Sequence, residues 1–393
     1  MNISETLQLQ IKSRQKRFLA IGIIGAVLCV VGAFTNSTMF FRGYLLGYMF
    51  WMNLTLGCLG LVMLHHLVGG DWGHASRRFL EAGMRTLPLM LVLFIPLLVA
   101  MPTLYEWARP EHVAHDPILT QKANYLNPTW FSIRTGIYFL FWFVWMRMLY
   151  KGSQDFERTP NLSIVQRLEN ISGPGVVLFF LATTFASFDW VMSLEPHWYS
   201  TIYGALFVVG QGLATLAFAI IMTTWFSRHE PFSELTTQKQ LHDLGKLTHG
   251  FVVLWAYAAF SQFLIIWSAN LPEEIPWYLH RIRGGWEAIG LFLMIFHFFV
   301  PFFLLLSRQR KRQKERIFRV ALFILLVRFV DLVWMIIPAF PNQGFPLHVM
   351  YFIPTIAIGG IWLGMFFWLL QGRSLLPLPD NSYDAVTGEL EHA

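Results

Sequence analysis

Ionisable side chains lie inside the apolar stretches of this sequence. The clearest is Asp189, which follows the apolar run 174–188 and precedes a corner that contains Glu195 and Pro196. An ionised side chain in hydrocarbon costs about 3 kcal/mol or more, so such residues face protein or water and commonly serve ion or proton transfer. A carboxyl group isolated from cations there favours its protonated form. We therefore predict that Asp189 is a protonatable group of a transmembrane relay.

Further ionisable residues recur at graded depths in other apolar runs. Arg328 and Asp331 are three residues apart, so a helix places them on one face near the middle of their run, and His297 is central in the run before. Chains of acidic groups and histidines are typical of proton relays in membrane proteins. The predicted relay consists of Asp189, Glu195, Glu287, His297, Arg328, Asp331, His249, Lys246 and Tyr257, with His65 and His66 where protons would enter from the cytoplasm.

Each of these residues also has a purely structural interpretation. Arg328 and Asp331 could neutralise one another as an intrahelical pair, and His297 could be a core histidine with satisfied hydrogen bonds. An ionisable residue near a membrane interface costs little free energy, because its side chain reaches water. This applies to Arg134, Glu195, Glu287, His65 and His66.

The composition is that of an integral membrane protein. Of 393 residues, 55% are hydrophobic and 13% are charged, whereas soluble proteins carry about 25% charged residues. Apolar runs of about 20 residues, long enough to cross a bilayer, recur ten times. The predicted spans are 17–35, 42–67, 84–104, 129–150, 174–195, 201–226, 247–269, 284–306, 317–340 and 348–370.

The connecting segments alternate in charge, which predicts the orientation. Basic residues concentrate at the N-terminus and in the segments 68–83, 151–173, 227–246 and 307–316. The positive-inside rule places these segments and both termini in the cytoplasm. We predict that residues 373–393 form a polar, acidic cytoplasmic tail. The net charge of +6 is thus an orientation signal, and nothing accompanies it that would predict nucleic-acid binding.

The sequence predicts no metal or redox cofactor bound by this chain. Cys29 and Cys58 lie in separate apolar runs without the spacing of an iron–sulfur or haem-attachment motif. Two axial haem ligands would need histidines at matched depth on facing helices, and no such pair is evident. Glycine-rich nucleotide-binding loops and the HExxH zinc motif are also missing.

Four short stretches carry a resemblance to a known family. They are 188–196 (FDWVMSLEP), 255–262 (WAYAAFSQ), 267–274 (WSANLPEE) and 284–287 (GGWE). With the ten-span plan, they resemble the NrfD-like membrane subunits, and more narrowly the smaller of the two such subunits in alternative complex III. The resemblance covers nearly the whole chain.

The resemblance implies an all-α fold of ten transmembrane helices over residues 1–372. Spans two to five (about 42–195) and six to nine (about 201–340) would form two four-helix bundles related by inverted symmetry, with spans one and ten peripheral. Inverted repeats commonly place functional groups near the midplane at their interface. Arg134 and Asp189 would be the residues nearest to a quinone.

The resemblance also implies a function. The chain would be a subunit of a quinol:cytochrome c oxidoreductase in the bacterial cytoplasmic membrane, surrounded by lipid. Its partners would be the larger NrfD-like subunit, an iron–sulfur protein and c-type cytochrome subunits, which hold the redox cofactors. The chain itself would supply a proton-conducting path or half-channels and anchor the assembly; whether it also handles quinol stays open. The alternatives are a free-standing proton-coupled transporter and a purely structural scaffold.

Overall fold

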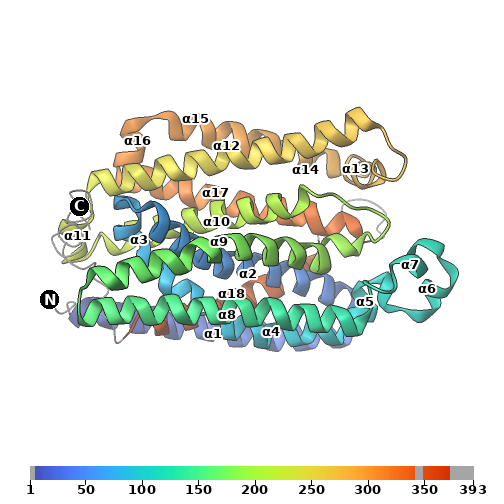
Figure 1. The fold of residues 1–393 in the computed structure, drawn as a ribbon, viewed down its shortest axis with the longest axis horizontal. Coiled ribbons are helices and arrows are strands. Elements are labelled where there is room, and N and C mark those ends of the chain that lie inside the picture. Colours follow the sequence, from blue (N-terminus) through green and yellow to red (C-terminus); the bar gives the residue numbers. More distant parts are fainter. Residues whose placement is uncertain (1–4, 341–347, 372–393) are drawn as a thin grey trace.

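Long helices run side by side along one axis in a computed structural model of the protein (Figure 1). The structure describes residues 5–340 and 348–371, so the predicted tail 373–393 lies outside the described residues. Within them most residues are helical and none forms a strand. The all-α fold class is confirmed.

The elements of the first half are α1 (Glu5–Thr35), α2 (Ser37–Val68), α3 (Asp71–Met84), α4 (Leu87–Val99), α5 (Met101–Leu104), η1 (Glu106–Ala108), α6 (Pro110–His115), α7 (Pro117–Lys122), α8 (Pro128–Arg158), α9 (Leu162–Trp190) and η2 (Met192–Leu194). Those of the second half are α10 (Tyr203–Phe226), α11 (Phe232–Leu235), α12 (Gln238–Ala269), α13 (Pro276–Arg281), α14 (Trp286–Leu293), η3 (Met294–Phe299), α15 (Val300–Leu306), α16 (Arg308–Arg312), α17 (Lys314–Ile336), η4 (Ile337–Ala339), η5 (Val349–Tyr351) and α18 (Ile353–Leu369). The segment η3 is a π-helix, and the other η elements are 3₁₀ turns.

Several of these helices are membrane-spanning in length and composition. Eight in the described chain qualify, or nine if α3 and α4, which meet at a 41° bend, form one span. The predicted span 129–150 falls in α8, which has 31 residues but is less apolar because it carries Arg134, Arg147 and Lys151. The structure therefore supports a multi-pass membrane protein, while the ten-span count stays a prediction.

Two helices begin well before the apolar runs from which they were predicted. Helix α9 starts at Leu162, where Asn161 caps it by accepting a hydrogen bond from the backbone N–H of Ser163, and α12 starts after a capping box formed by Thr237 and Gln240. Polar residues thus extend the helices beyond their apolar cores. At its other end α9 stops at Trp190, so Asp189 is its last residue but one, nearer to the helix end than the run 174–195 predicted.

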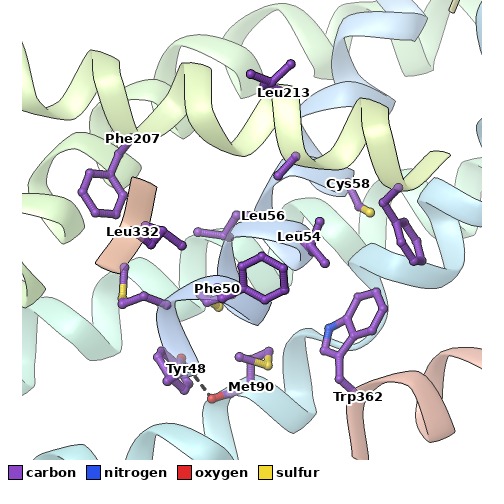
Figure 2. Packing of buried hydrophobic residues seen from close by; sticks show 14 of the residues in the cluster. Tyr48, Phe50, Leu54, Leu56, Cys58, Met90, Phe207, Leu213, Leu332 and Trp362 are labelled. Carbon is purple, nitrogen blue, oxygen red and sulfur yellow. Dashed lines mark hydrogen bonds between the residues drawn. The ribbon is translucent and has the colours of Figure 1, made fainter. Parts of the chain in front are cut away.

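The core is organised around α2 and α10, which are almost wholly buried. They approach closely at Gly57, where a Cβ atom would lie 2.6 Å from the carbonyl oxygen of Gln211. Figure 2 shows side chains of α2 gathered with Leu213 of α10, Leu332 of α17 and Trp362 of α18, and Tyr48 donates a hydrogen bond to the carbonyl of Met90 at 3.1 Å. Both halves of the chain therefore share one core.

The helices divide into two groups joined by α2 and α10. In the first, α2 packs against α3, α4 and α9, and α8 packs against α9. In the second, α10 packs against α12 and α17, α12 against α15, and α14 against α17. Helices α3 and α9 of the first group also pack against α10 of the second, so the two bundles expected from the sequence stay a prediction. Their inverted symmetry stays a prediction.

Helices α1 and α18 form a close antiparallel pair. A Cβ atom on Gly22 would lie 2.5 Å from the backbone nitrogen of Ile361, and one on Gly25 would lie 2.8 Å from Cα of Ala357. Most of α1 is exposed, as expected for a peripheral helix. By contrast, α18 packs on α2 and buries Trp362 completely, so it is less peripheral than the sequence suggested.

Candidate functional site

The Asp189 side chain is held by a clamp formed with two residues of α8. Arg134 donates through Nε to Oδ2 and through Nη2 to Oδ1, both at 2.9 Å, and Tyr138 donates to Oδ2 at 2.8 Å. The remaining Nη1 of Arg134 donates to the carbonyl of Tyr125 at 2.9 Å. We call Asp189, Arg134 and Tyr138 the Asp189 clamp. It corrects the sequence expectation of an isolated carboxyl, because both carboxylate oxygens accept hydrogen bonds from these two side chains.

Local structure around the clamp explains its geometry. Arg134 and Tyr138 are four residues apart and share one face of α8, which begins at Pro128 after the cap Asn127. On the other side, Ser193 donates to the backbone carbonyl of Asp189 at 2.5 Å where α9 ends. The clamp therefore ties the start of α8 to the end of α9.

A second cluster is buried between helices of the second group. Arg328 Nη1 pairs with Asp331 Oδ2 one turn along α17, and both side chains are buried. A Cβ atom on Gly210 of α10 would lie 2.2 Å from Arg328 Nη2, so glycine makes room for the guanidinium. His297 is fully buried in η3, and its ring centroid lies 4.0 Å from that of Trp255. We call Arg328, Asp331 and His297 the central cluster.

Much of the hydrogen-bonding capacity of the central cluster is unused. Within the described residues, Nε and Nη2 of Arg328 and both ring nitrogens of His297 are buried without a partner. Oε1 of Gln211, next to Gly210, and the side-chain amide of Asn53 in α2 are in the same condition. Buried polar groups are nearly always hydrogen-bonded to protein or to water. These atoms therefore suit a site whose polar groups are completed by water.

A third cluster lies beyond the end of the span that stops at Leu194. Arg281 Nη2 lies 2.9 Å from Glu195 Oε2, and Nδ1 of His280 lies 2.7 Å from Oε1. Burial opposes ionisation of Glu195, but Arg281 and His280 outweigh it and lower the pKa of this carboxyl. Arg281 is fully buried, and it also donates to the carbonyls of Trp334 and Met335, at the end of α17. We call Glu195, His280 and Arg281 the outer cluster; it borders an open cavity of about 1130 Å³.

The sequence pattern does not single out Glu81, which centres a fourth cluster at the opposite end. Arg77 Nε and Arg78 Nη1 each lie 3.0 Å from a different carboxylate oxygen of Glu81, and Ser153 of α8 donates to Oε1 at 2.6 Å. The spacing of Arg77 and Arg78 to Glu81, four and three residues on a helix, is the signal that could have revealed it. His65, predicted near this end, is also buried, and its Nε2 lies 3.2 Å from the carbonyl oxygen of Gly70.

Several residues predicted for the relay lie apart from these clusters. Tyr257 is 69% exposed on the outer face of α12, and Glu287 is exposed and accepts a hydrogen bond from the backbone of Gly285. Lys246 is exposed and pairs with Asp243 at 3.0 Å. His249 contacts the ring of Phe302 with centroids 5.0 Å apart. The structure does not bring these four residues into contact with the named clusters, so their part in a relay stays a prediction.

His66 is also buried, with its ring centroid 6.2 Å from that of His65.

Within residues 5–340 and 348–371, no group of three or more His, Cys, Asp or Glu side chains is arranged to hold a metal ion. In comparisons with known proteins, neither a protein-family model nor a curated protein matches the chain.

Proposed function

We propose that this chain is a membrane subunit of a quinol:electron-acceptor oxidoreductase of the alternative complex III type, where it anchors the assembly and provides a path for protons. Its sequence resemblance at 188–196 and 255–287 supports membership in such a complex. The observation that carries the proton path is the central cluster, a buried and partly unsatisfied set of ionisable groups between apolar helices.

The path that we propose runs through the second group of helices. His297 lies in a π-helical turn, a local distortion frequent at functional sites, and within the described residues both of its ring nitrogens are buried without a partner. The partnerless atoms of Arg328, Gln211 and Asn53 would hold water beside it. Water chains between such groups can carry protons where side chains alone do not touch.

The two end clusters would connect this path to the aqueous phases. The Glu81 cluster, with His65 nearby, lies at the end that carries the basic connecting segments. The outer cluster opens on the cavity beside Pro196 and Trp286. In this proposal that cavity also faces the partner subunits, an iron–sulfur protein and c-type cytochromes, which would hold the redox cofactors. A larger NrfD-like subunit would bind quinol, because the donors of Arg134 are already occupied by Asp189 and Tyr125.

Isolation of the tagged chain from native membranes tests the assignment to a complex. We expect haem-bearing and iron–sulfur partners to copurify, and we expect the reduced-minus-oxidised spectrum of the separated chain to be flat in the haem region. A chain that isolates alone and moves a solute with protons would favour the transporter. A stoichiometric b-type haem signal from the chain alone would overturn the proposal.

A structural scaffold is the second candidate, and one observation favours it. In the Asp189 clamp both carboxylate oxygens and all three donating groups of Arg134 have partners, as expected of a charge pair that only joins helices. If the central cluster also served only to join helices, the chain would provide no proton path.

A further inference from the structure

A cavity of about 420 Å³ lies at the basic end of the second group of helices. It is lined by Gln238, Arg308, Gln309, Arg312 and Gln313. Gln238 is the first residue of α12, and the others belong to α16 and the residue after it. Figure 1 shows α16 beside the start of α12, and the two helices pack together. We call these five residues the basic cavity.

The basic cavity carries positive charge. Only arginine and glutamine side chains line it, and within the described residues neither arginine forms an ion pair. Nε of Arg312 is buried and has no hydrogen-bond partner there. The neighbouring Lys311 adds charge, although burial and the nearby Lys246 lower its pKa. Guanidinium and amide donors converging on one space suit a ligand with several anionic oxygens, such as a phosphate ester.

The segment that leads into α16 exposes apolar side chains. Phe299, Phe303 and Leu306 are 42%, 62% and 54% exposed, and the last of them is two residues from Arg308. Exposed aromatic and aliphatic side chains on a membrane-spanning helix face acyl chains. A phosphate bound between the arginines would therefore have hydrocarbon directly beside it. A soluble phosphate compound would make no use of this surface.

We propose that the basic cavity binds the phosphate headgroup of an anionic phospholipid, whose acyl chains lie along α15. Basic pockets between transmembrane helices recognise such headgroups by combining charge with depth. The inference rests on the insertion of these helices in a membrane, and it holds whether or not the chain belongs to a quinol-oxidising complex.

The test uses the full-length chain in neutral detergent. Native mass spectrometry would count bound phosphatidylglycerol, with phosphatidylcholine as the zwitterionic comparison. We expect the double variant Arg308→Gln/Arg312→Gln to bind phosphatidylglycerol about 30-fold more weakly, since each basic residue near a membrane surface contributes about 1 kcal/mol. The matched control is Arg310→Gln/Arg316→Gln, which removes the same charge from the same basic run outside the cavity. It should bind within about 3-fold of the parent, because neither of these side chains lines the cavity and solvent-exposed charges contribute little.

Three results would overturn the proposal. Equal loss in both double variants would show attraction by net charge alone. If millimolar inorganic phosphate displaced the lipid, and the cavity bound phosphate as tightly as it binds the lipid, the site would be one for soluble anions. Lipid binding that appears only after deletion of the acidic residues 373–393 would make that segment the occupant.

Discussion

The Asp189 clamp and the central cluster each pair an arginine with an aspartate, but the two arginines differ in how many of their donors are hydrogen-bonded. In the clamp, Arg134 meets both oxygens of Asp189 and Tyr138 adds a third hydrogen bond. In the central cluster, Arg328 meets one oxygen of Asp331, while its Nε and Nη2 have no partner in the described residues. A satisfied network fixes one arrangement of helices, whereas an incomplete one needs water.

The comparison separates two roles that a buried charge can serve. A saturated pair has no free position for a passing proton, so the clamp is best understood as a structural joint between α8 and α9. The central cluster holds a histidine and an arginine on two packed elements, η3 and α17, and within the described residues both have polar atoms without a partner. The variants below test this separation, from the largest expected effect to the smallest.

Arg134→Met should have the largest effect on stability. It leaves the fully buried Asp189 carboxylate without its cation, and breaking a buried pair in this way costs about 3–5 kcal/mol. Unfolding in detergent, followed by helical circular dichroism, would measure the loss. The control Arg147→Met, at an exposed position of the same helix, should stay within about 0.5 kcal/mol of the parent. Adding Asp189→Asn to Arg134→Met should restore part of the stability, and no recovery would contradict the clamp.

Gly210→Ala should disturb the central cluster by about 1–3 kcal/mol. The added Cβ atom would lie 2.2 Å from Arg328 Nη2, so the guanidinium must move away from its place beside α10. Thermal unfolding of the variant measures this cost. Gly250→Ala, where a Cβ atom meets nothing within 4 Å, is the matched control and should be neutral or slightly stabilising. Equal behaviour of the two alanine variants would show that Arg328 does not need this position.

The outer cluster should give a smaller, pH-dependent effect of about 1 kcal/mol. Because the pKa of Glu195 is lowered in the folded protein, its ionised form stabilises the fold above the unfolded pKa of about 4.3. That contribution is lost as the pH falls through the lower folded value. Unfolding curves between pH 3 and 7 should therefore show a steeper decline for the parent than for Glu195→Gln. Glu273→Gln, an exposed change beside the same cavity, should keep the parental slope.

The general fold was predictable from the sequence, because long apolar runs are a strong one-dimensional signal. The pair Arg328–Asp331 was also predictable, since three-residue spacing on a helix brings side chains together. The contact between Arg134 and Asp189 was not, because the residues are 55 positions apart and meet only through the packing of α8 on α9. The exposure of Tyr257 was not predictable, because residues 250–269 of α12 are mostly apolar and their sequence does not reveal which face is exposed.

The place of Asp189 within its helix differs from the expectation for a related reason. Hydropathy does not mark where a helix ends, and α9 ends at Trp190 although the predicted span runs to 195. Glu81 was not predicted as a cluster centre because the basic residues of its segment dominate the sequence pattern there. Buried ion pairs between distant helices thus remain the part of this molecule that sequence patterns describe least well.

Proton movement per electron in vesicles that contain the reconstituted complex tests the central claim most directly. His297→Phe keeps an aromatic ring against Trp255 and removes no hydrogen bond present in the described residues, so its stability should change by less than about 1 kcal/mol. We predict that this variant assembles and oxidises quinol but moves fewer protons per electron. The fraction of Asp189→Asn that assembles should keep the parental ratio. An unchanged ratio in His297→Phe, or a lowered ratio in assembled Asp189→Asn, would contradict the account.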